Sequence, residues 1–217
     1  MNTKAFIFDL DGVIVDTAKY HYLAWRELAN QLGFDFTEEQ NEQLKGVSRV
    51  RSLEILLGIG KIELEEEVKI KLLHEKNEQY LTYIAKMDHT EILPGIHDLL
   101  NYLKKNGIPF SLGSASKNAR LILKTLNLME LFDAVVDGND VSTAKPDPEV
   151  FLIAAQKLGF LPQDCIVVED AKAGVQAANS AGMLSIGIGD EKVLSEADFT
   201  LKSTSELTID FAQKLLK

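Results

Sequence analysis

The feature that most constrains this chain is a short apolar run that ends in two aspartates. Residues 5–8 are Ala-Phe-Ile-Phe, which has the length and composition of a buried strand. Asp9 and Asp11 follow two positions apart, so in an extended backbone their side chains project to the same side, and Gly12 then permits a sharp turn. Two carboxylates this close repel each other unless one is protonated or a cation lies between them. A strand ending in an ordinary acidic turn is the alternative, but the pair favours a site for Mg²⁺, which prefers hard oxygen ligands.

The sequence after residue 93 predicts the fold class, because helical and strand patterns alternate there. Alternation of this kind indicates an α/β protein with a doubly wound parallel sheet and helices on both faces. The first strand would join this sheet. Strands are expected at 109–113, 134–137, 165–168, 184–188 and near Phe199, and helices at 96–105, 117–126, 148–158, 173–181 and 207–216.

The segment between the first strand and this alternation has helical patterns and no convincing strand. We therefore expect two domains, an α/β core of residues 1–16 and 89–217 and an inserted α-helical cap of residues 17–88. Ligands of open α/β sheets bind outside the carboxyl ends of the strands, and an inserted cap could close over that edge. The helices of the cap are expected at 17–32, 38–44, 49–57 and 62–87.

Three later strand ends carry polar residues that could complete a site. Ser114 stands before a helix N-terminus, where backbone N–H groups favour an anion, although it could also be an ordinary helix cap. Lys145 lies in a Lys-Pro-Asp-Pro segment and would by default be a solvated surface charge. Glu169 and Asp170 end an apolar run, where acidic residues could simply decorate a helix N-terminus.

In this order, the four strand ends resemble the four motifs of the haloacid dehalogenase (HAD) superfamily, and residues 9–17, Asp-Leu-Asp-Gly-Val-Ile-Val-Asp-Thr, correspond to the first motif. The resemblance implies that Asp9 attacks phosphorus and becomes an aspartyl phosphate, while Asp11 shuttles the proton. The residue types suit these roles, because a carboxylate is a competent nucleophile and a nearby carboxyl group can protonate a leaving oxygen. In the same comparison, Ser114 binds the phosphate, and Lys145 neutralises the charge that Asp9 and the phosphate share.

The same resemblance implies a bound Mg²⁺ ion. Its ligands would be the Asp9 carboxylate, the backbone carbonyl of Asp11, and Glu169 and Asp170, directly or through water. Such an ion supplies charge stabilisation and orientation to a transferring phosphoryl group.

The predicted cap carries the residues that would choose the substrate. Its loop 45–49, Lys-Gly-Val-Ser-Arg, is basic and contains a glycine, and the Arg49 guanidinium suits a phosphate dianion. Ser52 lies three residues further along the same helical face. His21 and Lys76 are further candidates, although His21 could be a packed helix residue and Lys76 a solvated one.

Three strings, at residues 17–25, 44–49 and 114–118, resemble those of the HAD mutases that act on glucose phosphates. The resemblance implies an isomerase that interconverts β-glucose 1-phosphate and glucose 6-phosphate through β-glucose 1,6-bisphosphate, which is also the activating intermediate. Arg49 would hold the distal phosphate of the substrate. The catalytic residues implied are Asp9, Asp11, Thr17, His21, Ser114 and Lys145. The substrate-binding residues implied are Gly46, Val47, Ser48, Arg49, Ser52, Lys76, Ser116, Lys117 and Asn118.

Two other functions are compatible with the same core. A HAD phosphatase acting on a sugar phosphate would use the same core residues and release phosphate to water. A phospho-acceptor switch, as in receiver-like α/β proteins, would also carry Asp9. Such a switch would need neither Asp11 nor a large helical lid.

Composition narrows the partners and the compartment. A net charge of −10 over 217 residues argues against nucleic acid and anionic membranes. The single cysteine, Cys165, cannot form an internal disulfide, which is compatible with a reducing compartment. Because the sequence has no signal-peptide pattern and no apolar run of ~18 residues, we expect a cytoplasmic protein. We also expect a monomeric enzyme whose partner is a small sugar phosphate.

Overall fold

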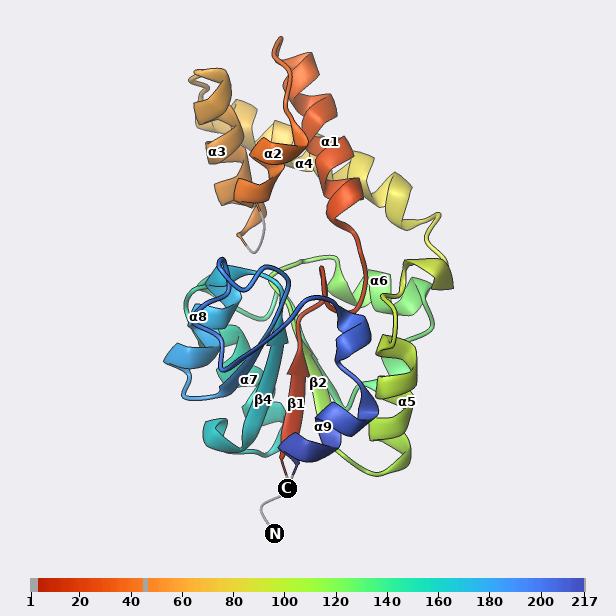
Figure 1. Ribbon diagram of the computed structural model, residues 1–217. Helices are drawn as coiled ribbons and strands as arrows, with labels where there is room; N and C mark the ends of the chain where they lie inside the picture. The colour runs from red at the N-terminus through yellow and green to blue at the C-terminus, as the bar shows by residue number, and fades with distance from the viewer. Residues whose placement is uncertain (1–3, 45–46, 217) are drawn as a thin grey trace.

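The computed structural model describes residues 4–44 and 47–216, and a six-stranded parallel sheet forms its centre (Figure 1). The strand order is β3-β2-β1-β4-β5-β6, and each neighbouring pair is parallel. The first strand of the chain therefore lies in the middle of the sheet, between the second and the fourth. The strands are β1 (Ala5–Phe8), β2 (Phe110–Gly113), β3 (Ala134–Val136), β4 (Cys165–Glu169), β5 (Leu184–Ile188) and β6 (Phe199–Leu201).

Alternate residues of β1 face two different apolar layers, because successive side chains of a strand point to opposite faces. Phe6 and Phe8 belong to the cluster on one face, and Ala5 and Ile7 belong to the cluster on the other. Helices cover both faces, so the predicted α/β fold with a doubly wound parallel sheet is confirmed. The helices of the first face are α5 (Ile96–Lys105), α6 (Ala119–Thr125) and α9 (Ile209–Leu215), and those of the second are α7 (Glu149–Leu158) and α8 (Lys172–Ser180).

The helices between β1 and α5 form a layer above the carboxyl ends of the strands (Figure 1). They pack around an apolar cluster of their own, in which Trp25, Phe36 and Leu56 are buried. The two segments that connect the helical layer to the sheet run side by side, since Val15 and Ile92 form an antiparallel bridge. The helical insertion is thus present, while the proposed domain boundaries at 16/17 and 88/89 stay predictions. The helices of this layer are α1 (Ala18–Gln31), α2 (Glu38–Asn41), α3 (Arg49–Gly60) and α4 (Glu66–Ile84).

Short 3-10 helices connect several of these elements. None of the helices within the described ranges combines the length and the apolar character needed to cross a membrane. The 3-10 helices are η1 (Glu42–Leu44), η2 (His89–Glu91), η3 (Met129–Leu131), η4 (Pro162–Asp164) and η5 (Thr204–Glu206).

The long helix expected at 62–87 is shorter at both ends, since α4 spans Glu66–Ile84. Ile62 and Leu64 pack against the apolar cluster of the helical layer from non-helical backbone. Their apolar side chains therefore continued the helical pattern in the sequence without belonging to the helix. Glu65, the N-cap residue of α4, has an extended backbone, and acidic residues fill the first turn of this helix, where they suit the helix dipole.

Two shorter helices also differ from expectation. The helix expected at 38–44 is α-helical to Asn41 and 3-10 after it. The helix expected at 117–126 begins at Ala119, so its first two expected residues belong to the loop after β2. The hydroxyls of Ser114 and Ser116 each accept from the N–H two residues further on, which favours a turn over a helix here.

Candidate active site at the carboxyl ends of the strands

Three carboxylates meet at the carboxyl ends of β1 and β4. These strands are parallel neighbours with Phe8 opposite Val168, so Asp9 and Glu169 follow side by side. One carboxylate oxygen from each of Asp9, Glu169 and Asp170 lies within 4.8 Å of the others. The fold thus brings together three side chains that the sequence assigned to a metal.

Lys145 lies buried among these acids. Its Nζ atom donates to Asp9 Oδ1 at 2.6 Å, to Glu169 Oε1 at 2.5 Å and to the Gly113 carbonyl at 3.2 Å. Burial alone would lower the pKa of Lys145, but the two carboxylates raise it above its usual range, so the lysine is charged. This charge offsets part of the repulsion between the carboxylates.

The two aspartates of the first motif differ in protonation. Burial raises the pKa of Asp9 to about 6, against the lowering effect of Lys145. Burial, and then the neighbouring Asp9 charge, raise the pKa of Asp11 to about 8. At neutral pH Asp9 is therefore mainly ionised and Asp11 mainly protonated, a division that suits a nucleophile and a proton donor. The Thr17 hydroxyl donates to Asp11 Oδ1 and fixes this carboxyl group.

Two glycines make room for the carboxylates. Gly12 has a positive φ of 77°, and a Cβ atom there would overlap the Asp170 carboxylate. A Cβ atom on Gly174, in the first turn of α8, would likewise overlap the Glu169 carboxylate.

Glu169 also accepts from Ala171 N at 2.8 Å, yet each carboxylate oxygen has a second lone pair to offer. This all-oxygen donor set fits a hard divalent cation such as Mg²⁺.

The loop of residues 114–118, after β2, forms another side of the site. Ser114 is buried, and its N–H donates to the Val136 carbonyl of β3 at 3.0 Å. Its hydroxyl accepts from Ser116 N at 3.1 Å. Asn118 Nδ2 donates to Asn77 Oδ1 of α4 at 2.9 Å, so this loop contacts the helical layer directly.

The helical layer contributes two cations, Lys76 and Arg49. Lys76 is buried, and its Nζ atom lies 2.9 Å from His21 Nδ1 and 4.6 Å and 4.7 Å from the ring centroids of Trp25 and Tyr80. Burial, followed by the Arg49 charge, lowers the pKa of Lys76 to about 7. Burial, followed by the charges of Lys76 and Arg49, lowers the pKa of His21 well below its usual range. The neutral His21 ring can therefore accept a hydrogen bond from Lys76.

A cavity of about 610 Å³ connects the two groups of residues. Asp9 and Asp11 line it from the sheet, and Arg49 and Lys76 line it from the helical layer. Among the described residues, no carboxylate oxygen lies within 4.0 Å of the charged nitrogens of Arg49 or Lys76. Among the described residues, the cavity is therefore lined by two basic side chains with no carboxylate partner and by a metal-type acidic cluster.

Most residues that the sequence assigned to the site line this cavity, although the hydroxyls of Ser48 and Ser52 make local bonds. Ser48 Oγ accepts from Arg51 N at the start of α3, and Ser52 Oγ donates to the Ser48 carbonyl. Thr17 is buried beside Asp11, and Gly46 lies outside the described residues. The predicted residues at the cavity wall are Asp9, Asp11, His21, Val47, Ser48, Arg49, Ser52, Lys76, Ser114, Ser116, Lys117, Asn118, Lys145, Glu169 and Asp170.

Two aromatic residues beside Lys76, and Asn77, which binds Asn118, are not among the site residues that the sequence predicted. Trp25 follows His21 by four positions, and Tyr80 follows Lys76 by four, a spacing that places each pair on one helical face. Helical periodicity could therefore have identified both aromatic residues. No comparable signal marks Asn77.

Known proteins resemble this chain over nearly its whole length. The haloacid dehalogenase-like hydrolase family model matches residues 3–182. A β-phosphoglucomutase from Bacillus subtilis (strain 168) is 44% identical over 209 residues, which are 95% of this chain and 92% of the relative. A phosphorylated carbohydrates phosphatase from Thermotoga maritima is 32% identical over 201 residues, which are 89% of this chain and 91% of the relative.

A solved structure agrees with these relatives. The crystal structure of β-phosphoglucomutase from Clostridium difficile superposes with a TM-score of 0.92 at 45% identity, covering 97% of this chain and 96% of that chain. The similarity therefore includes both the sheet and the helical layer. With this coverage, the chain belongs to the haloacid dehalogenase-like hydrolase family.

Proposed function

We propose that this chain is a Mg²⁺-dependent β-phosphoglucomutase, which interconverts β-glucose 1-phosphate and glucose 6-phosphate through an aspartyl phosphate and β-glucose 1,6-bisphosphate. The observation that carries the proposal is a cavity that Asp9 and Lys145 line from the sheet and that the basic residues Arg49 and Lys76 line from the helical layer. A bisphosphate can use both sets of residues at once, whereas hydrolysis of a monophosphate needs only the first set. The 44% identity to the Bacillus subtilis β-phosphoglucomutase supports the same substrate.

Asp9 and Asp11 divide the chemistry of both half-reactions. The phosphoryl group on Asp9 passes to the C6 hydroxyl of β-glucose 1-phosphate, so the Asp9 O–P bond breaks, the C6 O–P bond forms, and Asp11 takes the hydroxyl proton. After the bisphosphate has turned round, Asp9 attacks the C1 phosphate and Asp11 returns the proton to the departing C1 oxygen. Thr17 holds Asp11 in place, and Lys145 neutralises Asp9 and the phosphate.

The residues present also suit a resident metal ion. Asp9, Glu169 and Asp170, with the backbone carbonyl of Asp11, would hold Mg²⁺, which when bound stabilises the charge of the phosphoryl group.

Arg49 and Lys76 hold the second phosphate of the bisphosphate, and His21 orients Lys76.

Removal of divalent cations should stop turnover and lower the melting temperature, because a ligand that binds only the folded chain stabilises it. At about 100 times its Kd, Mg²⁺ should add roughly 2.7 kcal/mol to the free energy of unfolding. Asp170→Ala should remove this gain, and thermal unfolding with Mg²⁺ or with a chelator measures it. Asp98→Ala, which changes an exposed acid of α5, is the control and should keep the shift. An undiminished Mg²⁺-dependent rise in the melting temperature of Asp170→Ala would show that Asp170 does not bind the metal.

A sugar-phosphate phosphatase is the second candidate. The Thermotoga maritima relative, a phosphorylated carbohydrates phosphatase, supports it, because its 32% identity extends over 89% of this chain. The same core would serve, with water in place of the sugar hydroxyl attacking the aspartyl phosphate. Product analysis separates the two functions: the protein receives β-glucose 1-phosphate, Mg²⁺ and a trace of the bisphosphate, and glucose 6-phosphate and free phosphate are measured together.

Arg49→Ala should lower glucose 6-phosphate formation about 10–100-fold, since a hydrogen bond to a charged group contributes roughly 1.5–3 kcal/mol. Slow hydrolysis of the phosphoenzyme should persist, because Asp9 and Asp11 are unchanged. Arg49→Lys should also lose much of the mutase rate, since an ammonium group cannot copy the guanidinium fork.

Arg51→Ala is the matched control for Arg49. Arg51 lies on the same helix but is exposed and pairs with Glu54 at 2.7 Å, so its loss should leave both products unchanged. A wild-type protein that releases mainly free phosphate, or an Arg49→Ala variant with intact glucose 6-phosphate formation, would favour the phosphatase instead.

A further inference from the structure

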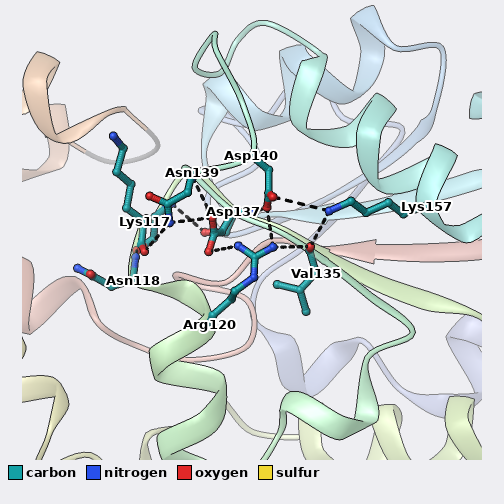
Figure 2. Close-up of polar contacts among 10 residues, drawn as sticks. Lys117, Asn118, Arg120, Val135, Asp137, Asn139, Asp140 and Lys157 are labelled. Atoms are coloured by element: carbon teal, nitrogen blue, oxygen red, sulfur yellow. Dashed lines mark hydrogen bonds and ion pairs between the residues drawn. The ribbon is translucent and has the colours of Figure 1, made fainter.

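A polar network lies beside the 114–118 loop, among residues with no role in the proposed reaction (Figure 2). Arg120, in the first turn of α6, forms ion pairs with Asp137 and with Asp140, the latter at 2.7 Å. The same guanidinium donates to the Val135 carbonyl of β3 at 3.0 Å. The Asp137 side chain is 1% exposed and that of Arg120 is 34% exposed. A partly exposed cation thus neutralises a buried carboxylate at the carboxyl end of β3. Loss of either partner would lower the free energy of unfolding.

Asp137 and Asp140 fix the turn of residues 137–140 that follows β3. Asp137 Oδ1 accepts from Asn139 N at 2.8 Å and from Asn139 Nδ2 at 3.0 Å. Asp140 Oδ2 accepts from Asp137 N at 2.8 Å. The two carboxylates share the Arg120 guanidinium, while Lys157 lies 3.7 Å from Asp140 and donates to the Val135 carbonyl at 3.3 Å. Arg120 therefore holds together a turn whose acidic groups would otherwise repel each other.

This turn binds the backbone of the 114–118 loop. Gly138 N donates to the Ser116 carbonyl at 3.2 Å, and Asn139 Nδ2 donates to the Lys117 carbonyl at 3.0 Å. A Cβ atom on Gly138 would overlap the Ala115 carbonyl, so the two backbones are in close contact. Because a trans peptide is planar and its carbonyl and N–H groups point in opposite directions, fixing the Ser116 carbonyl also fixes the direction of the Lys117 N–H.

We propose that Arg120 and Asn139 are positioning residues for phosphoryl transfer, which act through Asp137 and the 137–140 turn to hold the 114–118 loop in its phosphate-binding geometry. The proposal rests on the proposed function, since that function assigns the loop and its Ser114 hydroxyl to the phosphate. None of the network side chains has to touch the substrate. Misplacement of a positioned group by about 1 Å can cost about 10²-fold in rate, so a loosened loop should be visible in catalysis.

Two variants and one matched control test this role. Arg120→Gln removes the cation, and Asn139→Ala removes the amide that donates to the Lys117 carbonyl and to Asp137 Oδ1 while leaving both carboxylate partners of Arg120 in place. Lys104→Gln is the control, because Lys104 pairs with Asp133 at 2.8 Å at the opposite end of β3. Arg120 and Lys104 are both partly exposed partners of an aspartate next to the same strand, but only Arg120 lies at the site edge.

Each protein is measured for its affinity for inorganic phosphate in the presence of Mg²⁺, for kcat and KM with β-glucose 1-phosphate, and for melting temperature. We expect Arg120→Gln and Asn139→Ala to weaken phosphate binding several-fold and to lower kcat about 10–100-fold, with Lys104→Gln unchanged in both. A merely structural role would lower melting temperatures without a selective loss of phosphate affinity. Wild-type phosphate affinity in Asn139→Ala overturns the proposal, even if Arg120→Gln fails to fold.

The phosphate measurement separates this proposal from the proposed function. A wild-type protein that binds phosphate but forms no glucose 6-phosphate overturns the proposed function alone, and weakened phosphate binding in Asn139→Ala would still support the positioning role. Conversely, glucose 6-phosphate formation by the wild type, together with undiminished phosphate affinity in the variants, overturns the positioning role alone.

Discussion

Asp9→Asn is expected to abolish both phosphoenzyme formation and glucose 6-phosphate formation, because an amide cannot form the acyl phosphate. Loss of a catalytic nucleophile can cost on the order of 10⁶-fold in kcat. The fold should survive, since asparagine can still accept the hydrogen bond from Lys145, which keeps Glu169 as its ionic partner. Intact-mass measurement after an acid quench should find a phosphoryl group on the wild type and none on the variant.

The control for Asp9→Asn is the same change at an exposed acid. Asp98→Asn, on α5, should keep the full rate and the phosphoenzyme. Melting temperatures of all three proteins show whether a lost activity reflects a lost fold. Near-normal turnover by a folded Asp9→Asn variant would contradict the covalent mechanism.

The location of the acidic site could be predicted because parallel strands place their carboxyl ends at one edge of the sheet. Once residues 5–8 and 165–168 are recognised as strands, Asp9 and Glu169 must lie at that edge. The strand order could not be predicted in the same way. It is the central place of β1, between β2 and β4, that brings Ser114 from one side and Glu169 from the other to Asp9.

Protonation and contacts within the helical layer depend on burial, which the local sequence does not determine. Asp9 and Asp11 are chemically identical in the sequence, yet burial raises their pKa values to about 6 and about 8. Likewise, His21 and Lys76 could each be read as an ordinary helix residue. Only the packing of α1 against α4 brings their nitrogens to 2.9 Å and leaves Lys76 buried.

The network of Arg120 was not predicted for a related reason. Its residues have the composition of an ordinary polar surface, and they flank β3 and α6 without a recognisable motif. Their contacts arise because β3 pairs with β2, which places the 137–140 turn beside the 114–118 loop. Pattern and motif therefore indicate the groups that react, while tertiary packing decides which groups hold them in position.

Asp11→Asn should lower turnover of β-glucose 1-phosphate about 10²–10⁴-fold, the usual contribution of general acid–base catalysis. Burial and the Asp9 charge raise the pKa of Asp11 to about 8, which keeps the carboxyl group protonated at neutral pH, whereas an amide has no proton to give. The Thr17 hydroxyl can still donate to the asparagine oxygen, and the backbone carbonyl of residue 11 is unchanged. The Mg²⁺-dependent rise in melting temperature should therefore persist in this variant.

The leaving group separates the role of Asp11 from that of Asp9. Acetyl phosphate releases acetate, a weak base that needs no proton, so Asp11→Asn should accept a phosphoryl group from it at a rate near that of the wild type. Asp9→Asn should accept none. From β-glucose 1,6-bisphosphate, whose departing sugar oxygen needs the proton, phosphorylation of Asp11→Asn should be about 10²–10⁴-fold slower than that of the wild type. Rapid-quench intact-mass measurements give both rates, and equal slowing with the two donors would assign Asp11 to positioning instead of proton transfer.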